Sequence, residues 1–171
     1  MKKKRLLPLG ILAVLVLAAL IYTRPMTLEA MFGLDITQSE LVYTDYLTVS
    51  IDEPGRSVES SVWPRGEERT EKLNELLSQQ KFRRSLINLL SPDGGSTHQP
   101  KDGDFIWDLS FNFGPTDFPD GSTGSGTFLQ CRNFFGVLRI FNAVEDETLR
   151  CTVQDQEAFL QQVYDIISAE P

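Results

Sequence analysis

The stretch Phe105-Ile106-Trp107-Asp108-Leu109-Ser110-Phe111-Asn112-Phe113 decides the fold, because a large apolar side chain stands at every second position. The residues that alternate with these apolar side chains between Trp107 and Phe113 are all polar. Successive side chains of a β-strand point to opposite faces, so this alternation predicts one face in the core and the other partly in water. We therefore expect residues 105–113 to form a central strand of a sheet.

Further short strands are expected on both sides of this stretch. Downstream, turn residues separate three apolar runs, which predicts an antiparallel meander: Thr127–Arg132, Val137–Phe141 and Leu149–Val153. Upstream, two alternating runs flank the turn sequence Asp52-Glu53-Pro54-Gly55, namely Leu47, Val49 and Ile51 before it and Val58 and Val62 after it. Proline and glycine suit the two central positions of a type II turn, so this part predicts a hairpin.

Two helices are predicted from apolar residues at helical spacing. The first spans Glu67–Gln80 and has an apolar face of Leu73, Leu76 and Leu77. The last begins after Asp155, which we expect to cap it, and its apolar face consists of Phe159, Leu160, Val163, Ile166 and Ile167. The segment Lys81–Leu90 is ambiguous and fits either an apolar edge or a second short helix.

These elements predict an α+β fold, in which two helices pack on an antiparallel sheet of about five to six strands. One face of the sheet is expected to stay partly solvated. We expect a single N-terminal transmembrane helix to precede this fold. We divide the chain into a cytoplasmic basic tail (1–5), a transmembrane signal anchor (6–23), a juxtamembrane connector (24–40) and an extracytoplasmic domain (41–171).

The transmembrane helix is predicted because Leu6–Tyr22 contains no charged residue and 11 of its 17 residues are Leu, Ile or Val. As a helix it is about 25 Å long, slightly shorter than a hydrocarbon core of roughly 30 Å. Lys2, Lys3, Lys4 and Arg5 precede it, and the positive-inside rule keeps such residues in the cytoplasm. We expect a single-pass protein of the cell membrane, anchored through residues 6–22, with its C-terminal domain outside.

Cleavage of this segment as a signal peptide, with secretion of the domain, is the alternative. Cleavage needs small residues just before the cut, and Leu20-Ile21-Tyr22-Thr23-Arg24-Pro25 does not supply them. No cysteine follows the apolar run, so the usual lipoprotein arrangement is absent from the sequence. These features favour the uncleaved anchor.

The charge of the exported part limits its partners. Four of the 16 Lys and Arg residues stand at positions 2–5, whereas all 24 Asp and Glu residues follow residue 24. The part beyond the membrane therefore carries a net charge of about −12, which repels nucleic-acid phosphates and anionic lipid headgroups. The sequence argues against nucleic-acid binding.

Four segments carry a resemblance to known proteins: Leu73-Asn74-Glu75-Leu76-Leu77, Trp107-Asp108-Leu109-Ser110-Phe111, Leu138-Arg139-Ile140 and the helix from Asp155 to Ile167. Residues 45–168 resemble small exported or membrane-anchored domains of unknown function from low-GC Gram-positive bacteria. The resemblance implies an extracytoplasmic address and an α+β fold. It implies no catalytic motif or activity. Many of those domains carry a lipid-modified cysteine after the signal, and this chain does not.

Cys131 and Cys151 are the two cysteines of the chain. Outside the membrane they could form a disulfide, or they could be two small buried thiols. In a meander they lie on strands that a third strand separates, so their Cα atoms would be about 9.5 Å apart, and a disulfide needs less than about 7 Å. This spacing favours the thiols.

Two loops contain polar residues that chemistry could use. His98, the single histidine, lies near Asp93, Asp102 and Asp104 in the loop 91–104, and a solvated loop histidine is favoured over a metal or acid–base site. Asp117 and Asp120 in the loop 114–126 lack the order of a calcium loop. The sequence therefore predicts no catalytic, cofactor-binding or metal-binding residue, and no cofactor.

We expect an uncharacterised, membrane-tethered interaction or sensor-like domain without catalytic activity. Its contact surfaces would be the solvated face of the sheet and the two loops, and its partner an envelope protein. The basic pair Arg83-Arg84 could dock an acidic partner, but a solvated helix end is favoured. An envelope hydrolase that uses His98 and an accessory subunit of a membrane complex are the alternatives. The sequence does not indicate the oligomeric state.

Overall fold

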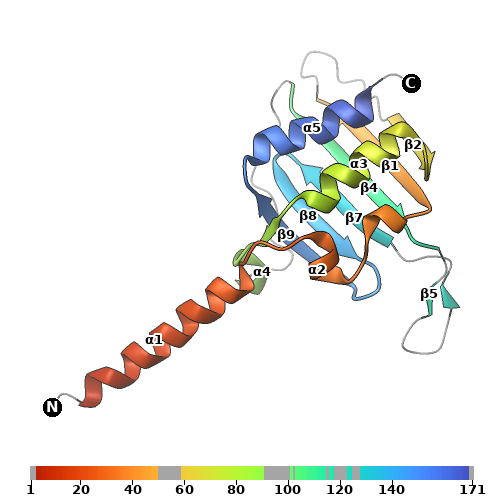
Figure 1. Cartoon of the computed structure of the whole chain (residues 1–171). Coiled ribbons are helices and arrows are strands. Elements are labelled where there is room, and N and C mark those ends of the chain that lie inside the picture. Colours follow the sequence, from red (N-terminus) through yellow and green to blue (C-terminus); the bar gives the residue numbers. More distant parts are fainter. Residues whose placement is uncertain are drawn as a thin grey trace.

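The computed structural model of the chain describes residues 3–49, 59–90, 101, 103–114, 116–117, 123–124 and 128–169. It is an α+β fold built on a seven-stranded antiparallel sheet with the strand order β2-β1-β4-β7-β8-β9-β3 (Figure 1). The elements in chain order are α1 (Lys3–Tyr22), α2 (Leu28–Phe32), η1 (Ile36–Gln38), β1 (Leu41–Thr48), β2 (Glu59–Pro64), α3 (Glu68–Gln79), β3 (Phe82–Arg84), α4 (Ile87–Leu90), β4 (Phe105–Asn112), β5 (Thr116–Asp117), β6 (Thr123–Gly124), β7 (Phe128–Phe134), β8 (Val137–Asn142), β9 (Glu147–Val153) and α5 (Gln156–Ser168).

Strand β4 and the meander after it follow the sequence pattern. Trp107, Leu109 and Phe111 are buried, and the residues between them point to the other face. β7, β8 and β9 pair antiparallel in sequence order, as the turn residues between them predicted. This part of the sheet confirms the antiparallel α+β prediction.

The hairpin before β4 is confirmed as a pair, but its strands lie differently from the prediction. β1 begins at Leu41, because Val42 and Thr44 face the core, and the polar Thr44 concealed this alternation in the sequence. In β2 the core residue is Trp63, whereas Val62 is 54% exposed on the other face. Residues 50–58, which contain the predicted turn, Ile51 and Val58, lie outside the described residues.

The main sheet has more strands than the predicted five to six, because the segment after α3 supplies β3. The segment Lys81–Leu90, which the sequence left ambiguous, forms strand β3, which was not counted among the predicted strands, and then the short helix α4. Phe82 is fully buried and pairs with Val153 of β9. A three-residue strand has too few positions to show a period of two, so the sequence could not distinguish it. A separate two-stranded pair, β5 and β6, lies within the predicted loop 114–126.

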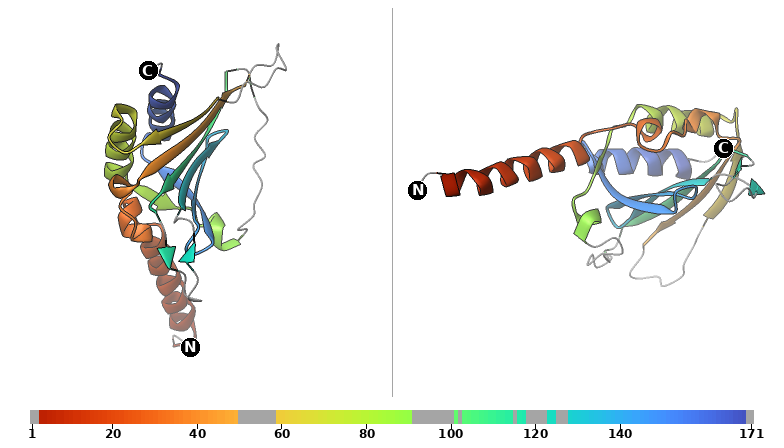
Figure 2. Two further views of the ribbon diagram at one scale, coloured as in Figure 1. Left: turned by 90° about the vertical axis from the view of Figure 1, so that its right-hand side faces the viewer. Right: turned by 90° about the horizontal axis from the view of Figure 1, so that it is seen from below.

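Helices α3 and α5 lie together on one side of the sheet (Figure 2). Both were predicted, and their apolar faces supply Leu73, Leu77 and Val163 to the core. Asp155 holds the N-cap position of α5, as predicted, with a φ of 50°. The expected side-chain cap is not formed, because its carboxylate accepts no hydrogen bond from a backbone N–H of the described helix.

The segment between α1 and β1 belongs to the same core. Leu28 and Ile36, from the predicted connector 24–40, are each 1% exposed, and Met26 forms a β-bridge with Phe82. α1 itself projects from the domain as a single rod (Figures 1 and 2). Among the helices formed by the described residues, none is long and apolar enough to cross a membrane.

Candidate functional site

The face of the sheet that is turned away from α3 and α5, here called the open face, carries a line of charged residues. Asp45 of β1 stands opposite Asp108 of β4, and Asp108 stands opposite Arg132 of β7. Arg132 stands opposite Arg139 of β8, which stands opposite Arg150 of β9. We call these five residues the charge row. It crosses five adjacent strands, with two acids at one end and three arginines at the other.

The charge row places like charges next to each other at three of its four steps. Neighbouring strands are about 4.8 Å apart, and like charges directly opposite each other on an antiparallel pair are destabilising. Asp45 faces Asp108, and Arg139 lies between two further arginines. Core packing does not require such a row, because these side chains are on the face that the helices leave uncovered. The arrangement is typical of a surface that binds a charged ligand or a charged protein partner.

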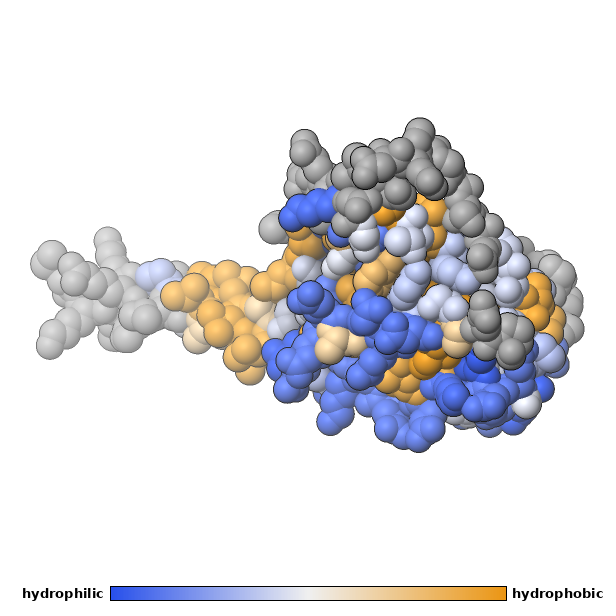
Figure 3. Space-filling view, turned by 90° about the horizontal axis from the view of Figure 1, so that it is seen from above, coloured by the Kyte–Doolittle hydropathy of each residue, from blue (hydrophilic) through white to orange (hydrophobic). Residues whose placement is uncertain are grey.

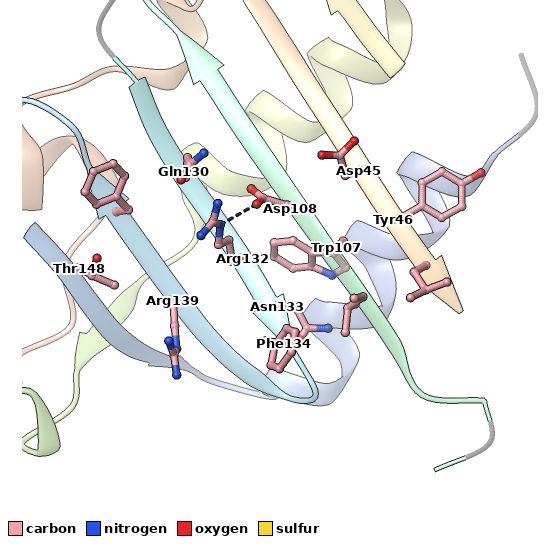
Figure 4. Close-up of a pocket in the computed structure, with 13 residues that line it drawn as sticks. Asp45, Tyr46, Trp107, Asp108, Gln130, Arg132, Asn133, Phe134, Arg139 and Thr148 are labelled. Atoms are coloured by element: carbon pink, nitrogen blue, oxygen red, sulfur yellow. Dashed lines mark hydrogen bonds and ion pairs between the residues drawn. The ribbon is translucent and has the colours of Figure 1, made fainter. Parts of the chain in front are cut away.

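The two signs meet at an ion pair in the middle of the row. The Nε atom of Arg132 donates to Oδ2 of Asp108 over 2.6 Å (Figure 4). Burial raises the pKa of the Asp108 carboxyl above its ordinary value, the Arg132 guanidinium counteracts this rise, and the Asp45 carboxylate adds to it. The other oxygen of Asp108, Oδ1, is buried and has no hydrogen-bond partner within the described part of the chain. The pair therefore leaves the carboxylate incompletely satisfied.

An open hollow of about 830 Å³ surrounds this pair, and its size is within the range of about 300–1,000 Å³ that is usual for ligand sites. Apolar and aromatic side chains form much of its lining, and Arg132 and Arg139 supply the cationic groups (Figure 4). The described residues around it are Asp45, Tyr46, Leu47, Ile106, Trp107, Asp108, Gln130, Arg132, Asn133, Phe134, Arg139, Phe141 and Thr148. The hollow thus combines an apolar surface with guanidinium donors.

Arg150 continues the row one strand beyond the hollow. Its Nε and Nη2 atoms are buried and make no hydrogen bond to any residue that the structure describes. A guanidinium has five N–H donors and cannot lose its proton in a protein, so donors without acceptors are costly when buried. Arg150 therefore has donor capacity that an anion would satisfy.

The cysteines are not part of this site. Cys131 and Cys151 are both free and buried, and strand β8 separates their strands, as the sequence predicted. Burial raises the pKa of Cys151 to about 12 and also raises the pKa of Cys131. Both therefore remain protonated thiols at neutral pH and are poor nucleophiles.

Those loop residues that the structure describes do not line the hollow. His98, Asp93, Asp102 and Asp120 lie outside the described residues. Asp104 accepts a hydrogen bond from the backbone of Lys101, in the loop before β4. Within the described part of the chain, no group of three or more His, Cys, Asp or Glu side chains could hold a metal ion.

Sequence reasoning missed the charge row, although part of its signal was present. Asp108, Arg132, Arg139 and Arg150 all fall on polar positions of predicted strands. Placing them opposite one another requires the register of each strand pair, which the period of two does not provide. Asp45 lay outside the predicted strands altogether.

No family model, curated protein or solved structure matches this chain. The resemblance to small exported domains stays a prediction, and the charge row and hollow are interpreted from their own chemistry.

Proposed function

We propose that this protein is a membrane-tethered extracytoplasmic binding domain without catalytic activity, whose open face binds an anionic ligand that has an apolar part. The observation that carries the proposal is the charge row beside the hollow. Its arginine end lies on a chain whose net charge is −8, so it is a local exception to the surrounding field. Planar guanidinium groups suit carboxylate and phosphate, because two parallel hydrogen bonds match their oxygens.

The lining of the hollow indicates the second part of the ligand. Ile106, Phe134 and Phe141 border the arginines, and Phe134 is 47% exposed. Apolar surface that remains exposed beside a cationic group favours a ligand with an apolar body and an anionic end. A fully hydrated inorganic anion would leave these aromatic side chains in water.

The tether is supported by the exposed apolar surface of α1. Leu12, Val14 and Leu20 are 59%, 66% and 62% exposed on a helix of 20 residues that projects from the domain as an apolar rod (Figure 3). Each Leu, Ile or Val contributes about −0.3 to −0.6 kcal/mol when it enters a bilayer. The membrane segment that we propose is the whole charge-free run Leu6–Tyr22 of the sequence. The cations at positions 2–5 then hold the N-terminus in the cytoplasm, and cleavage and secretion remain the alternative.

Ligand binding is tested on the full chain in nanodiscs by isothermal titration with phenyl phosphate, which joins an anionic group to an aromatic ring. The wild type should bind, and Arg139→Gln should weaken binding about tenfold or more, because a hydrogen bond to a charged group is worth about 1.5–3 kcal/mol. Arg65→Gln is the matched control, since it removes an exposed arginine outside the lining of the hollow. Equal binding by both variants would place the anion elsewhere.

The natural partner is sought by photo-crosslinking in intact cells. A photoreactive amino acid in place of Phe141 lies in the hollow, whereas the same amino acid in place of Val144 lies in the turn after β8. Crosslinks at the first position alone would support the open face as the binding surface.

Replacing residues 6–22 with an unrelated apolar helix separates this proposal from an accessory subunit that works through its membrane helix, because only the accessory subunit would lose function.

A further inference from the structure

We propose that the surface formed by β3 and α4 lies on the anionic headgroup layer of the membrane at the base of α1. This surface, here called the basal surface, consists of the exposed residues Lys81, Arg83, Leu86, Ile87 and Leu89. The inference rests on the membrane tether of the proposed function, but not on the ligand of the open face.

The first argument is the short and fixed connection between α1 and β3. The chain leaves α1 at Tyr22 and pairs with β3 only four residues later, where Met26 and Phe82 exchange two backbone hydrogen bonds of 2.9 and 2.8 Å. The guanidinium of Arg84 lies 5.8 Å from the centre of the Tyr22 ring, within cation–π range. β3 is therefore held at the end of α1 and is not separated from it by a flexible linker.

The second argument is the position of α4. The side-chain amide of Asn88 donates to the backbone oxygen of Arg150 over 3.0 Å, and its oxygen accepts from the backbone nitrogen of Arg150 over 2.9 Å. These two hydrogen bonds to the backbone of β9 hold α4 against the sheet. Both views in Figure 2 place α4 at the level along the α1 axis at which α1 enters the domain. A bilayer that α1 spans would therefore have its surface near α4.

The third argument is the composition of the basal surface. Leu86, Ile87 and Leu89 are 44%, 40% and 64% exposed, an unusual display for a segment of only a few residues. Lys81 and Arg83 are exposed beside them, and positions 81–90 contain no acidic residue although the chain carries 24. Exposed apolar side chains together with cations suit the boundary between headgroups and acyl chains. In water alone the exposure of the three apolar side chains would be unfavourable.

Contact at the basal surface would also orient the binding site. The open face is turned sideways relative to the axis of α1 in Figure 2. With α4 on the headgroups the hollow would open parallel to the membrane, where it could receive a ligand or a neighbouring envelope protein. A domain on a loose tether would present the hollow in all directions.

The test places an environment-sensitive fluorophore on Leu89→Cys in the full chain, reconstituted into vesicles of phosphatidylcholine with a minor fraction of phosphatidylglycerol. The native cysteines do not interfere, because both are buried thiols. Spin-labelled lipids should quench this fluorescence and aqueous iodide should not, as expected for a group in the interfacial zone. Val62→Cys is the matched control, since Val62 is similarly exposed at 54% on the edge strand β2, and its label should respond to aqueous iodide instead.

A second variant tests the charge. Arg83→Glu in the labelled protein should reduce the lipid-inserted fraction roughly fivefold or more in phosphatidylglycerol vesicles, because each cation near an anionic surface changes the partition by about that factor. Vesicles of phosphatidylcholine alone should show a smaller difference. Flotation of the vesicles separates the two proposals. Protein that does not float refutes the tether and this inference with it, whereas floating protein whose Leu89→Cys label is quenched by iodide refutes the basal surface alone.

Discussion

The two faces of the sheet carry two rows of residues that are direct neighbours in the sequence but differ sharply in burial and charge. Thr44, Leu109, Cys131, Ile140 and Leu149 form one continuous row of partners across β1, β4, β7, β8 and β9, and each is at most 2% exposed. Each of them is a direct neighbour in the chain of one member of the charge row. A step of one residue along the strand changes the face, so stability and binding are encoded at alternating positions of the same strands. Changes to the two rows should therefore have different kinds of effect.

Leu109→Ala should show the largest effect on stability. Leu109 is fully buried, and truncation of a buried leucine costs about 2–5 kcal/mol through lost burial and the remaining cavity. Denaturant unfolding of the purified full chain measures the change. Ser110→Ala, one position along on the open face, is the control and should cost about 1 kcal/mol or less. Equal losses would mean that both faces contribute similarly to the core.

Arg132→Gln should have an intermediate effect that depends on pH. The raised pKa of Asp108 should rise further, because the cation that opposes the rise is gone. Near neutral pH the variant should be less stable by about 1 kcal/mol, and the difference should disappear as the pH falls through the pKa of Asp108, where the carboxyl is neutral in both proteins. Carboxyl-detected NMR titration follows the pKa directly. Arg132→Lys keeps the positive charge and should restore part of the lost stability. An unchanged titration of Asp108 in Arg132→Gln would show that the ion pair does not form in solution.

Asp45→Asn should have the smallest effect, and in the opposite direction. A raised folded-state pKa means that Asp108 contributes stability below its unfolded pKa of about 3.9, and that this contribution is lost as the pH rises through the folded pKa. Removing the Asp45 charge lowers the pKa of Asp108 and reduces this loss. The variant should gain about 0.2–1 kcal/mol near neutral pH and nothing in strong acid. Asp35→Asn, at the start of η1, removes a carboxylate that the structure uses as a cap and should not give this gain.

The elements that the sequence predicted well are those whose pattern is contained within one segment. The alternation at 105–113 predicted β4, the meander predicted β7 to β9, and the helical spacing of Leu73 or Val163 predicted α3 and α5. The free, buried state of the two cysteines followed from the same meander. The errors arose where the pattern was interrupted by a polar core residue, as at Thr44, or was only three residues long, as in β3.

For the site, the sequence determined which residues could take part, and the tertiary structure decided which of them meet. The residue types, the charge-free run Leu6–Tyr22 and the polar parity of each strand are local properties that the chain carries before it folds. The alignment of Asp45 with Arg150 across five strands, and the position of Lys81–Leu90 at the end of α1, depend on the pairing of segments up to about seventy residues apart, as in Leu41 with Asn112. Register is a collective result of packing and of every turn between the strands, so no single stretch of sequence contains it.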